Sequence, residues 1–268
     1  MESLGGAEFS EVPVLAPTSR TYERDTTTSM RGAVSFDLRA VPADVSIRTE
    51  AVGAQLHSDH WQRVLSVIVA AIALAVLFPV FIAIAVVIKL TSRGPIIYRQ
   101  SRVGIDRRRT RVRAMYDRRH VNLGGEIFTI YKFRTMRVDS EREGMRWAGQ
   151  NDSRVTRVGR ILRLTRLDEL PQLINVLRGD MNIVGPRPER PLIFQQLREE
   201  IRQYDLRQRA RPGITGWAQI NQKYDSTVAD VRRKVQYDLA YLDRRSVAED
   251  LRIMLKTIPV MLFRRGAQ

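Results

Sequence analysis

The sequence predicts a mostly α-helical protein with a short β-hairpin or small sheet, held on a membrane by one re-entrant, proline-broken helix. Residues 64–88 form an uncharged apolar run, which indicates the membrane helix. Residues 127–133 alternate as a strand does, and leucines recur at helical spacing between residues 167 and 177. The expected parts are a polar tail (1–58), the membrane helix (59–90) and a folded domain that carries the chemistry (91–268).

The composition limits the classes of partner. The 268 residues include 45 Lys and Arg against 29 Asp and Glu, a formal net charge of +16. Such an excess attracts polyanions, meaning nucleic acid, anionic lipid headgroups or phosphorylated substrates, and charge alone does not choose between them. The chain has no cysteine, which excludes a disulfide framework, a thiolate metal site and a thiol nucleophile and agrees with a cytoplasmic setting.

Two segments lack the periodicity of a packed element. Residues 1–58 are rich in Ser, Thr, Ala and Gly and are predicted to be a mostly disordered tail. Residues 106–120 contain seven arginines in fifteen positions with a single tyrosine. We expect this stretch to be a solvated loop first, a contact for anionic membrane lipids second, and a nucleic-acid contact last, because aromatic residues for base stacking are almost missing.

The apolar run from Val64 to Ile88 has the length of a membrane helix. Its 25 residues carry no charge and would form a helix of about 37 Å, against a hydrocarbon core of about 30 Å. Pro79 removes one backbone hydrogen bond and leaves arms of about 22 and 14 Å, each too short to cross alone. A spanning and a re-entrant helix both fit the residues, and the short arms favour re-entrance with a break at Pro79. The basic residues that follow place the C-terminal side in the cytoplasm.

Two segments after this helix have strand character. Residues 96–104 and 126–136 are short runs rich in β-branched and aromatic residues, and an interfacial stretch is an alternative for residues 96–104. Lys132 and Arg134 in the second run are candidates for contacts to an anionic substrate, and a solvated strand edge is an equal alternative. Near the C-terminus, residues 253–263 fit either an interfacial helix or a helix packed on the core.

The leucine spacing after residue 167 predicts an amphipathic helix that ends at Gly179. Pro171 is tolerated only in a first turn, so the helix is expected to start between residues 165 and 168, where Thr165 and Asp168 have capping-box spacing. Asp168 and Glu169 would then lie in the first turn. There the helix dipole and neighbouring arginines hold both carboxylates ionised.

The pair Asp168 and Glu169 is the first candidate for chemistry. The two acids can simply cap a helix, but adjacent carboxylates repel and favour a cation beside them, for which Mg²⁺ is the natural candidate. Asp168, Gln172 and Asn175 form one polar stripe at helical spacing. Arg187 stands between two prolines, a rigid fork suited to gripping phosphate. Such a set suits phosphoryl transfer, in which positioning and charge neutralisation do most of the catalysis.

Four motifs in order resemble the bacterial sugar transferases, the monotopic polyprenol-phosphate phosphoglycosyl transferases. The resemblance covers roughly residues 61 to 262, and several long motifs together are far more specific than one short pattern. Relative to the family pattern, residues 106–123 are an arginine-rich insertion. The motifs are KFRTM (132–136), LDELPQLINVLRGDMNIVGPRPERP (167–191), RPGITGWAQIN (211–221) and YDLAYL (237–242).

The resemblance implies transfer of a sugar-1-phosphate from a nucleotide diphosphate sugar, a UDP-sugar, to undecaprenyl phosphate, as in priming of exopolysaccharide or O-antigen synthesis. It implies that Asp168 is the nucleophile of a covalent phosphosugar intermediate and that Glu169 binds Mg²⁺. It also implies a bacterial inner-membrane protein with its catalytic domain on the cytoplasmic face. Anionic lipids are expected partners, nucleic acid is not, and a homodimer is left open. The alternatives are a membrane-tethered nucleic-acid-binding protein and a non-catalytic scaffold.

Overall fold

The computed structural model describes residues 52–107, 124–138, 140, 152–222 and 227–262. The predicted tail up to residue 51 and the arginine-rich stretch from residue 108 to 123 lie outside these residues. In chain order the elements are α1 (Val52–Thr91), β1 (Ile97–Val103), β2 (Ile127–Phe133), α3 (Arg157–Leu164), the 3₁₀ turn η3 (Leu167–Glu169), α4 (Gln172–Arg178), β3 (Asn182–Val184), α5 (Pro191–Glu200), η4 (Tyr204–Arg209), β4 (Gly213–Thr215), α6 (Trp217–Asn221), α7 (Val228–Arg244) and α8 (Val247–Leu262).

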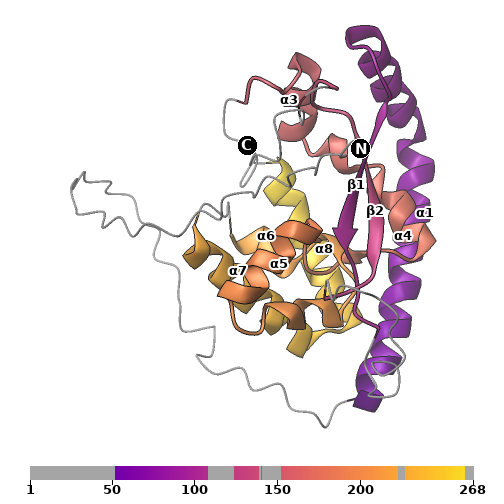
Figure 1. Ribbon diagram of the computed structural model, residues 1–268. Helices are drawn as coiled ribbons and strands as arrows, with labels where there is room; N and C mark the ends of the chain where they lie inside the picture. The colour runs from indigo at the N-terminus through magenta and orange to yellow at the C-terminus, as the bar shows by residue number, and fades with distance from the viewer. Residues whose placement is uncertain (1–51, 108–123, 139, 141–151, 223–226, 263–268) are drawn as a thin grey trace, which may run out of the picture. The chain divides into compact units, whose positions relative to one another are not determined.

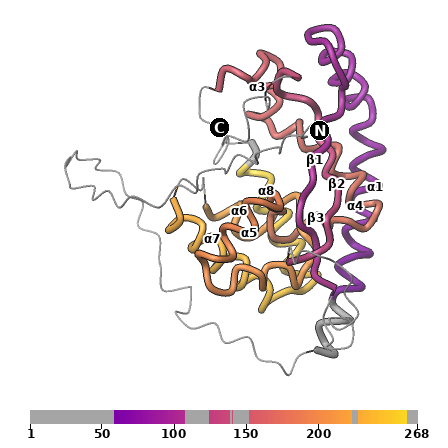
Figure 2. Tube along the Cα trace, viewed as in Figure 1, coloured from indigo at the N-terminus to yellow at the C-terminus, as the bar shows by residue number. Residues whose placement is uncertain are grey.

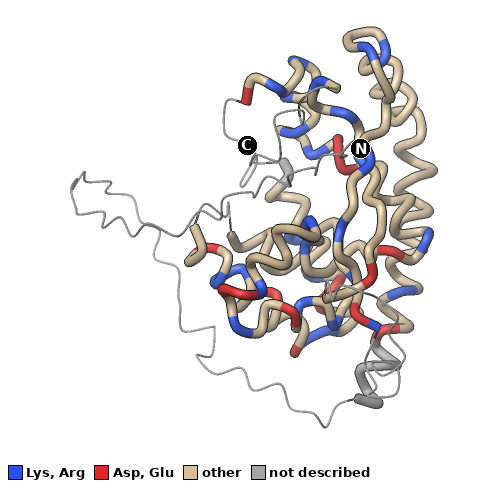
Figure 3. The backbone as a smooth tube through the Cα atoms, viewed as in Figure 1, with Lys and Arg blue, Asp and Glu red and all other residues tan. Residues whose placement is uncertain are grey.

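The predicted apolar helix is α1, a single helix of 40 residues (Figure 1). Among the described helices it alone is long and apolar enough to cross a membrane. Figure 3 shows no charged residue through its middle. Pro79 lies inside α1 and does not end it, so the re-entrant break at Pro79 stays a prediction.

Both strand predictions are confirmed. β1 and β2 pair in antiparallel fashion, with Ile97 opposite Phe133 and Val103 opposite Ile127. This is the expected β-hairpin, although the residues that join the strands are only partly described. A second small sheet joins β3 and β4 in parallel. There the backbones of Gly185 and Gly213 approach so closely that a Cβ on either would overlap the other segment.

Two apolar clusters contact α1, one on each side of Pro79. The larger cluster contains Ala70 of α1 together with buried residues of β1, α4, β3, α5, α7 and α8. The smaller one joins Ile84 and Ile88 to Phe133 of β2 and Leu162 of α3. Figure 2 shows α4 and β3 beside α1. The same folded unit therefore contacts both halves of the apolar helix.

A buried polar cluster joins the N-terminal part of α1 to α7 and α8. Gln62 donates from Nε2 to Asp250 Oδ2 at 2.9 Å, and the Tyr241 hydroxyl donates to the other oxygen of Asp250 at 2.8 Å. Arg245 donates to Gln62 and to Asp59. Burial raises the pKa of Asp250 to about 6. Residues 253–262 belong to α8, which packs on the core through the fully buried Ile253. Leu255 and Ile258 are exposed on the same helix, so an interfacial role for that face stays a prediction.

Candidate active site

The two acids of the predicted dyad lie between two helices. Asp168 and Glu169 belong to the 3₁₀ turn η3, and α4 begins only at Gln172. The predicted start of the helix at residues 165–168 is therefore wrong. Thr165 ends α3, and its hydroxyl donates back to the carbonyl of Ile161 at 2.9 Å, as helix-end threonines do. Arg166 then takes a left-handed conformation, with a φ of 56°, and redirects the chain into η3.

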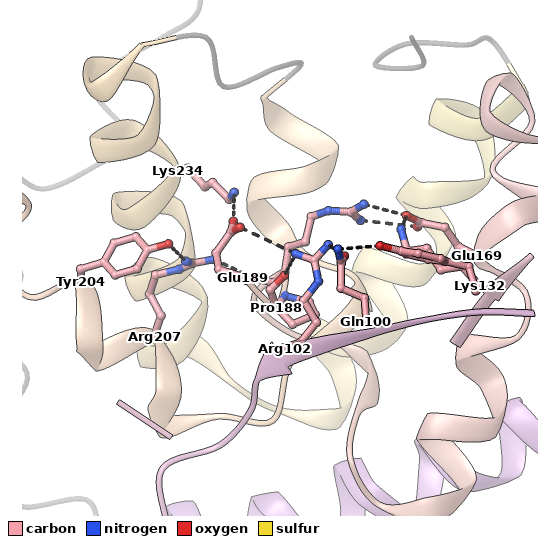
Figure 4. Close-up of polar contacts among 11 residues, drawn as sticks. Gln100, Arg102, Lys132, Glu169, Pro188, Glu189, Tyr204, Arg207 and Lys234 are labelled. Carbon is pink, nitrogen blue, oxygen red and sulfur yellow. Dashed lines mark hydrogen bonds and ion pairs between the residues drawn. The ribbon is translucent and has the colours of Figure 1, made fainter. Parts of the chain in front are cut away.

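Glu169 accepts charged hydrogen bonds from two different segments. Lys132 Nζ of β2 lies 2.8 Å from Glu169 Oε1. Arg187 Nη2 lies 2.6 Å from the same oxygen, and Arg187 Nη1 lies 3.4 Å from Oε2. Figure 4 shows Lys132 and Glu169 meeting at this point. The structure thus brings together three residues that the sequence separates by 37 and 18 positions.

The two carboxyl groups differ in pKa. Burial alone raises the pKa of Glu169, but Arg187 and Lys132 bring it well below its usual value. Burial raises the pKa of Asp168 to about 6, against the opposing effect of Lys132. The sequence predicted that a helix dipole and neighbouring arginines hold both carboxylates ionised. At Asp168 burial outweighs the nearby positive charges, and no α-helix starts at this turn, so its pKa lies above and not below the usual value.

Asp168 is the less constrained of the two acids. It is 8% exposed, and among the described residues its carboxylate oxygens accept no hydrogen bond. A buried carboxylate without a partner keeps its lone pairs for a ligand. A raised pKa also makes this oxygen a better nucleophile than an ordinary carboxylate, while it remains mostly ionised at neutral pH.

A magnesium ion is compatible with this donor set. In the described part of the chain no three His, Asp or Glu side chains gather as a metal site. Mg²⁺ commonly takes one or two carboxylates and completes its shell with water and substrate phosphates. Asp168 and Glu169 supply two carboxylates, and the cations on Glu169 reduce its attraction for a metal. A diphosphate substrate would have to provide the rest of the ligands.

The other predicted site residues have different positions. Arg134 donates to the backbone carbonyl and the hydroxyl of Ser92, at 2.8 Å each, so it binds the end of α1 and not the acids. Gln172 is 2% exposed, and its Nε2 has no partner among the described residues. Asn175 is fully buried and donates to Thr129 O at 2.7 Å, while its Oδ1 accepts from Tyr131 N at 3.0 Å.

The Asn175 side-chain amide therefore binds the backbone of β2 as a neighbouring strand would, and β2 is the strand that carries Lys132. We expect Asn175→Ala to lower the free energy of unfolding by about 1–3 kcal/mol, because it removes three part-buried hydrogen bonds, two to the backbone of β2 and one to Asp180. Thermal unfolding of the purified protein measures the loss. The control is Asn221→Ala. It removes one side-chain hydrogen bond, to the carbonyl of Trp217 within the same short helix α6, and no bond to β2. Equal losses in the two variants would contradict this role.

Strand β1 adds residues that were not predicted from the sequence. Tyr98 pairs with Lys132 across the hairpin, and Gln100 and Arg102 follow on the same face. Gln100 donates to the Tyr98 hydroxyl at 3.0 Å and accepts from Arg102 Nη2 at 2.6 Å. Arg102 Nη1 reaches Pro188 O at 3.0 Å. Figure 4 shows Gln100 and Arg102 in the same polar network as Glu169. In the sequence, polar residues alternate along 98–102, which places them on one face of a strand. Only the pairing register of β1 with β2 shows that this face is the one that carries Lys132.

Comparison with known proteins settles the family. A family model described as bacterial sugar transferase matches residues 57–264. This chain belongs to the bacterial sugar transferase family. The match includes α1, the hairpin, the dyad turn and the Arg187 loop, so the resemblance predicted from the four motifs is confirmed.

Several named proteins are similar to this bacterial sugar transferase. It is 40% identical over 207 residues to the UDP-N-acetylgalactosamine-undecaprenyl-phosphate N-acetylgalactosaminephosphotransferase of Aeromonas hydrophila, covering 77% of this chain and 45% of the relative. It is 40% identical over 199 residues to the UDP-glucose:undecaprenyl-phosphate glucose-1-phosphate transferase of Escherichia coli K12, covering 74% and 39%. For the protein of that name from Caulobacter vibrioides the values are 40% over 206 residues, 76% and 70%. This bacterial sugar transferase thus spans less than half of the first two relatives.

Proposed function

We propose that this bacterial sugar transferase moves a sugar-1-phosphate from a UDP-sugar to undecaprenyl phosphate, the first membrane step of lipid-linked glycan or exopolysaccharide synthesis. The observation that carries the proposal is the buried Asp168 carboxylate, unpaired among the described residues, next to Glu169, which Lys132 and Arg187 hold. The relatives named above are undecaprenyl-phosphate transferases of UDP-sugars, which supports the choice of both substrates.

The reaction proceeds in two displacements. An Asp168 oxygen attacks the phosphorus that carries the sugar, the bond from this phosphorus to the bridging oxygen breaks, and UMP leaves with that electron pair. An oxygen of undecaprenyl phosphate then attacks the same phosphorus and breaks its bond to Asp168, which restores the carboxylate. Because each displacement uses the same buried carboxylate, the kinetics are ping-pong.

Lys132 and Arg187 supply the positive charge that the donor needs. The Arg187 side chain is 34% exposed, so a diphosphate can reach the guanidinium while Glu169 fixes its orientation. Lys132 binds the same Glu169 oxygen as Arg187 does, and its ammonium adds a second positive charge for the donor diphosphate. Mg²⁺ held by Glu169 with the diphosphate would stabilise charge on the departing nucleotide. Gln172 offers one more N–H to the bound donor.

UMP release tests this function directly. The purified protein is incubated with a polyprenyl phosphate, Mg²⁺ and each of several UDP-sugars, and UMP is measured with and without the lipid acceptor. Turnover that requires the lipid, together with one-equivalent UMP release without it, is the expected result. No UMP from any UDP-sugar would favour a non-catalytic scaffold instead.

Helix α1 enters the membrane and returns to the same side, with its break near Pro79. Contacts at both of its ends support this topology. Gln62 at the beginning binds Asp250, and Ser92 after the end accepts two bonds from Arg134. A helix that crossed the bilayer would carry one end to the opposite side, out of reach of a polar domain that must stay in water. The catalytic domain then lies on the cytoplasmic face.

Single cysteines in this cysteine-free chain test the topology. We expect cysteines at residues 40 and 230 to be labelled alike by a membrane-impermeant thiol reagent, both protected in intact cells and both labelled after lysis. The physical reason is that neither side of a re-entrant helix reaches the outer face. Labelling of residue 40 alone in intact cells would mean that α1 spans the membrane. A cysteine in a periplasmic reporter protein serves as the positive control for the reagent.

A further inference from the structure

The loop that carries Arg187 is held by its carbonyl oxygens. Four consecutive carbonyls accept one hydrogen bond each, and every donor belongs to another segment of the chain. Pro186 and Pro188 have no N–H, and their rings fix φ, so the loop cannot hold its position through a backbone ladder of its own. The four bonds are Gly213 N to Pro186 O at 3.0 Å, Arg207 Nη2 to Arg187 O at 3.0 Å, Arg102 Nη1 to Pro188 O at 3.0 Å and Val103 N to Glu189 O at 2.9 Å.

Arg207 makes the contact to the carbonyl of Arg187, the residue of this loop that binds Glu169. Its side chain is completely buried and donates from all three nitrogens. Nε reaches Asp238 Oδ2 at 2.7 Å, Nη1 reaches the Tyr204 hydroxyl at 2.8 Å, and Nη2 reaches the carbonyl of Arg187. Figure 4 shows Arg207 beside Tyr204, on the far side of Glu189 from the Lys132 and Glu169 pair. Arg207 is therefore too well occupied to bind substrate itself.

We propose that Arg207 is a positioning residue, which sets the place of the Arg187 guanidinium by fixing the Arg187 backbone carbonyl. The proposal rests on the function proposed above, in which Arg187 binds the donor diphosphate. A guanidinium that moves by about 1 Å relative to a reacting phosphate can cost a hundredfold in rate. Asp238 fixes Nε of Arg207 at 2.7 Å, and the planar guanidinium then directs Nη2 at the Arg187 carbonyl.

A purely structural role predicts a different behaviour. A buried ion pair is weak evidence for stability by itself, and losing one partner leaves an uncompensated charge whatever the function. Arg207→Lys keeps the positive charge beside Asp238 but has one nitrogen in place of three, so it cannot reach Asp238, Tyr204 and the Arg187 carbonyl together. It therefore tests the carbonyl contact more selectively than Arg207→Ala. The matched control is Tyr204→Phe, which removes one bond to Arg207 and leaves the Arg187 contact in place.

The functional test is a double-mutant cycle with Arg187→Lys, using kcat and the donor KM from UMP release. We expect Arg207→Lys to lower kcat/KM for the UDP-sugar by about tenfold or more in the native background, and by less than about twofold when residue 187 is already Lys. Tyr204→Phe should change kcat/KM by less than about threefold. Equal fold-losses in both backgrounds would overturn the proposal, because Arg207 would then act independently of Arg187.

The second test needs no substrate. Val103 and Gly213 donate their amide hydrogens to the loop carbonyls, so hydrogen exchange at these two amides reports how firmly the loop is seated. Exchange at both should be faster in Arg207→Lys than in the native protein and in Tyr204→Phe. Unchanged exchange refutes the positioning role even if the protein releases no UMP, whereas absent UMP release alone refutes the proposed function. If Arg207→Lys does not fold, Arg207→Gln combined with Asp238→Asn leaves no unpaired buried charge and takes its place.

Discussion

Asp168→Asn is expected to stop turnover and to remove covalent labelling of the protein by the sugar-phosphate of the donor. An amide of nearly the same shape occupies the same buried position, but its oxygen is not anionic and cannot displace UMP. We expect UMP release to fall by at least about a thousandfold, judged from the loss that follows removal of other catalytic nucleophiles. Incubation with a radiolabelled UDP-sugar, followed by denaturing gel electrophoresis, measures the labelling.

The control for this variant is Asp243→Asn, which removes an exposed carboxylate on α7. It should keep both turnover and labelling. A labelled protein in the Asp168→Asn background would mean that another side chain carries the phosphosugar. Glu169 would then be the next candidate, because it is the only other carboxylate at this turn.

Glu169→Gln is expected to reduce both activity and stability. Glu169 is the common acceptor of Lys132 and Arg187, so its neutral analogue leaves the mostly buried Lys132 ammonium and the 34% exposed Arg187 guanidinium without their counter-ion. Removing one partner of a fully buried pair typically costs about 3–5 kcal/mol of unfolding free energy, and the exposure of Arg187 places the expected loss at the lower end of that range. UMP release should fall by at least about a hundredfold, because the Arg187 guanidinium loses its anchor and the proposed Mg²⁺ site loses a carboxylate. Thermal unfolding and the UMP assay measure the two losses separately.

A second substitution separates these two effects. Lys132→Met added to Glu169→Gln removes one of the uncompensated cations, and we expect it to restore part of the lost stability without restoring activity. If Glu169 were only a structural partner of Lys132, the double variant would regain activity along with stability. That outcome would contradict the proposed roles of Glu169 in binding Mg²⁺ and in positioning Arg187.

Local sequence patterns predicted the positions of α1 and β2, but they did not predict where one helix ends and the next begins. The uncharged run around Pro79 and the alternation in 127–133 depend on adjacent residues, and both α1 and β2 appear where expected. The spacing of Thr165 and Asp168 fitted a capping box, but the same threonine serves equally well at the end of α3. A pattern of three residues cannot distinguish the beginning of one helix from the end of the previous one.

Sequence spacing did not predict which residues meet at the site, because contacts between distant segments decide it. Asn175 fitted a polar stripe directed at substrate, whereas its amide binds the backbone of β2. Arg134 belongs to the same motif as Lys132, yet only Lys132 reaches Glu169. Arg102 was treated as one of the charges that follow the membrane helix, and the hairpin register places it on the same face as Lys132. Pairing between strands decides which of several basic residues meet the acids.

The bond between Gln62 and Asp250 has a consequence for biosynthesis. The two residues are 188 positions apart, and a ribosome adding 5–20 residues per second needs about 10–40 s to go from the first to the second. During this interval the apolar helix is already outside the ribosome, while the residues that will bury its polar start do not yet exist. Insertion into the lipid therefore precedes folding of the domain. A nascent chain arrested before residue 250 would be membrane-bound, and it would leave Gln62 without its Asp250 partner, open to water or to chaperones.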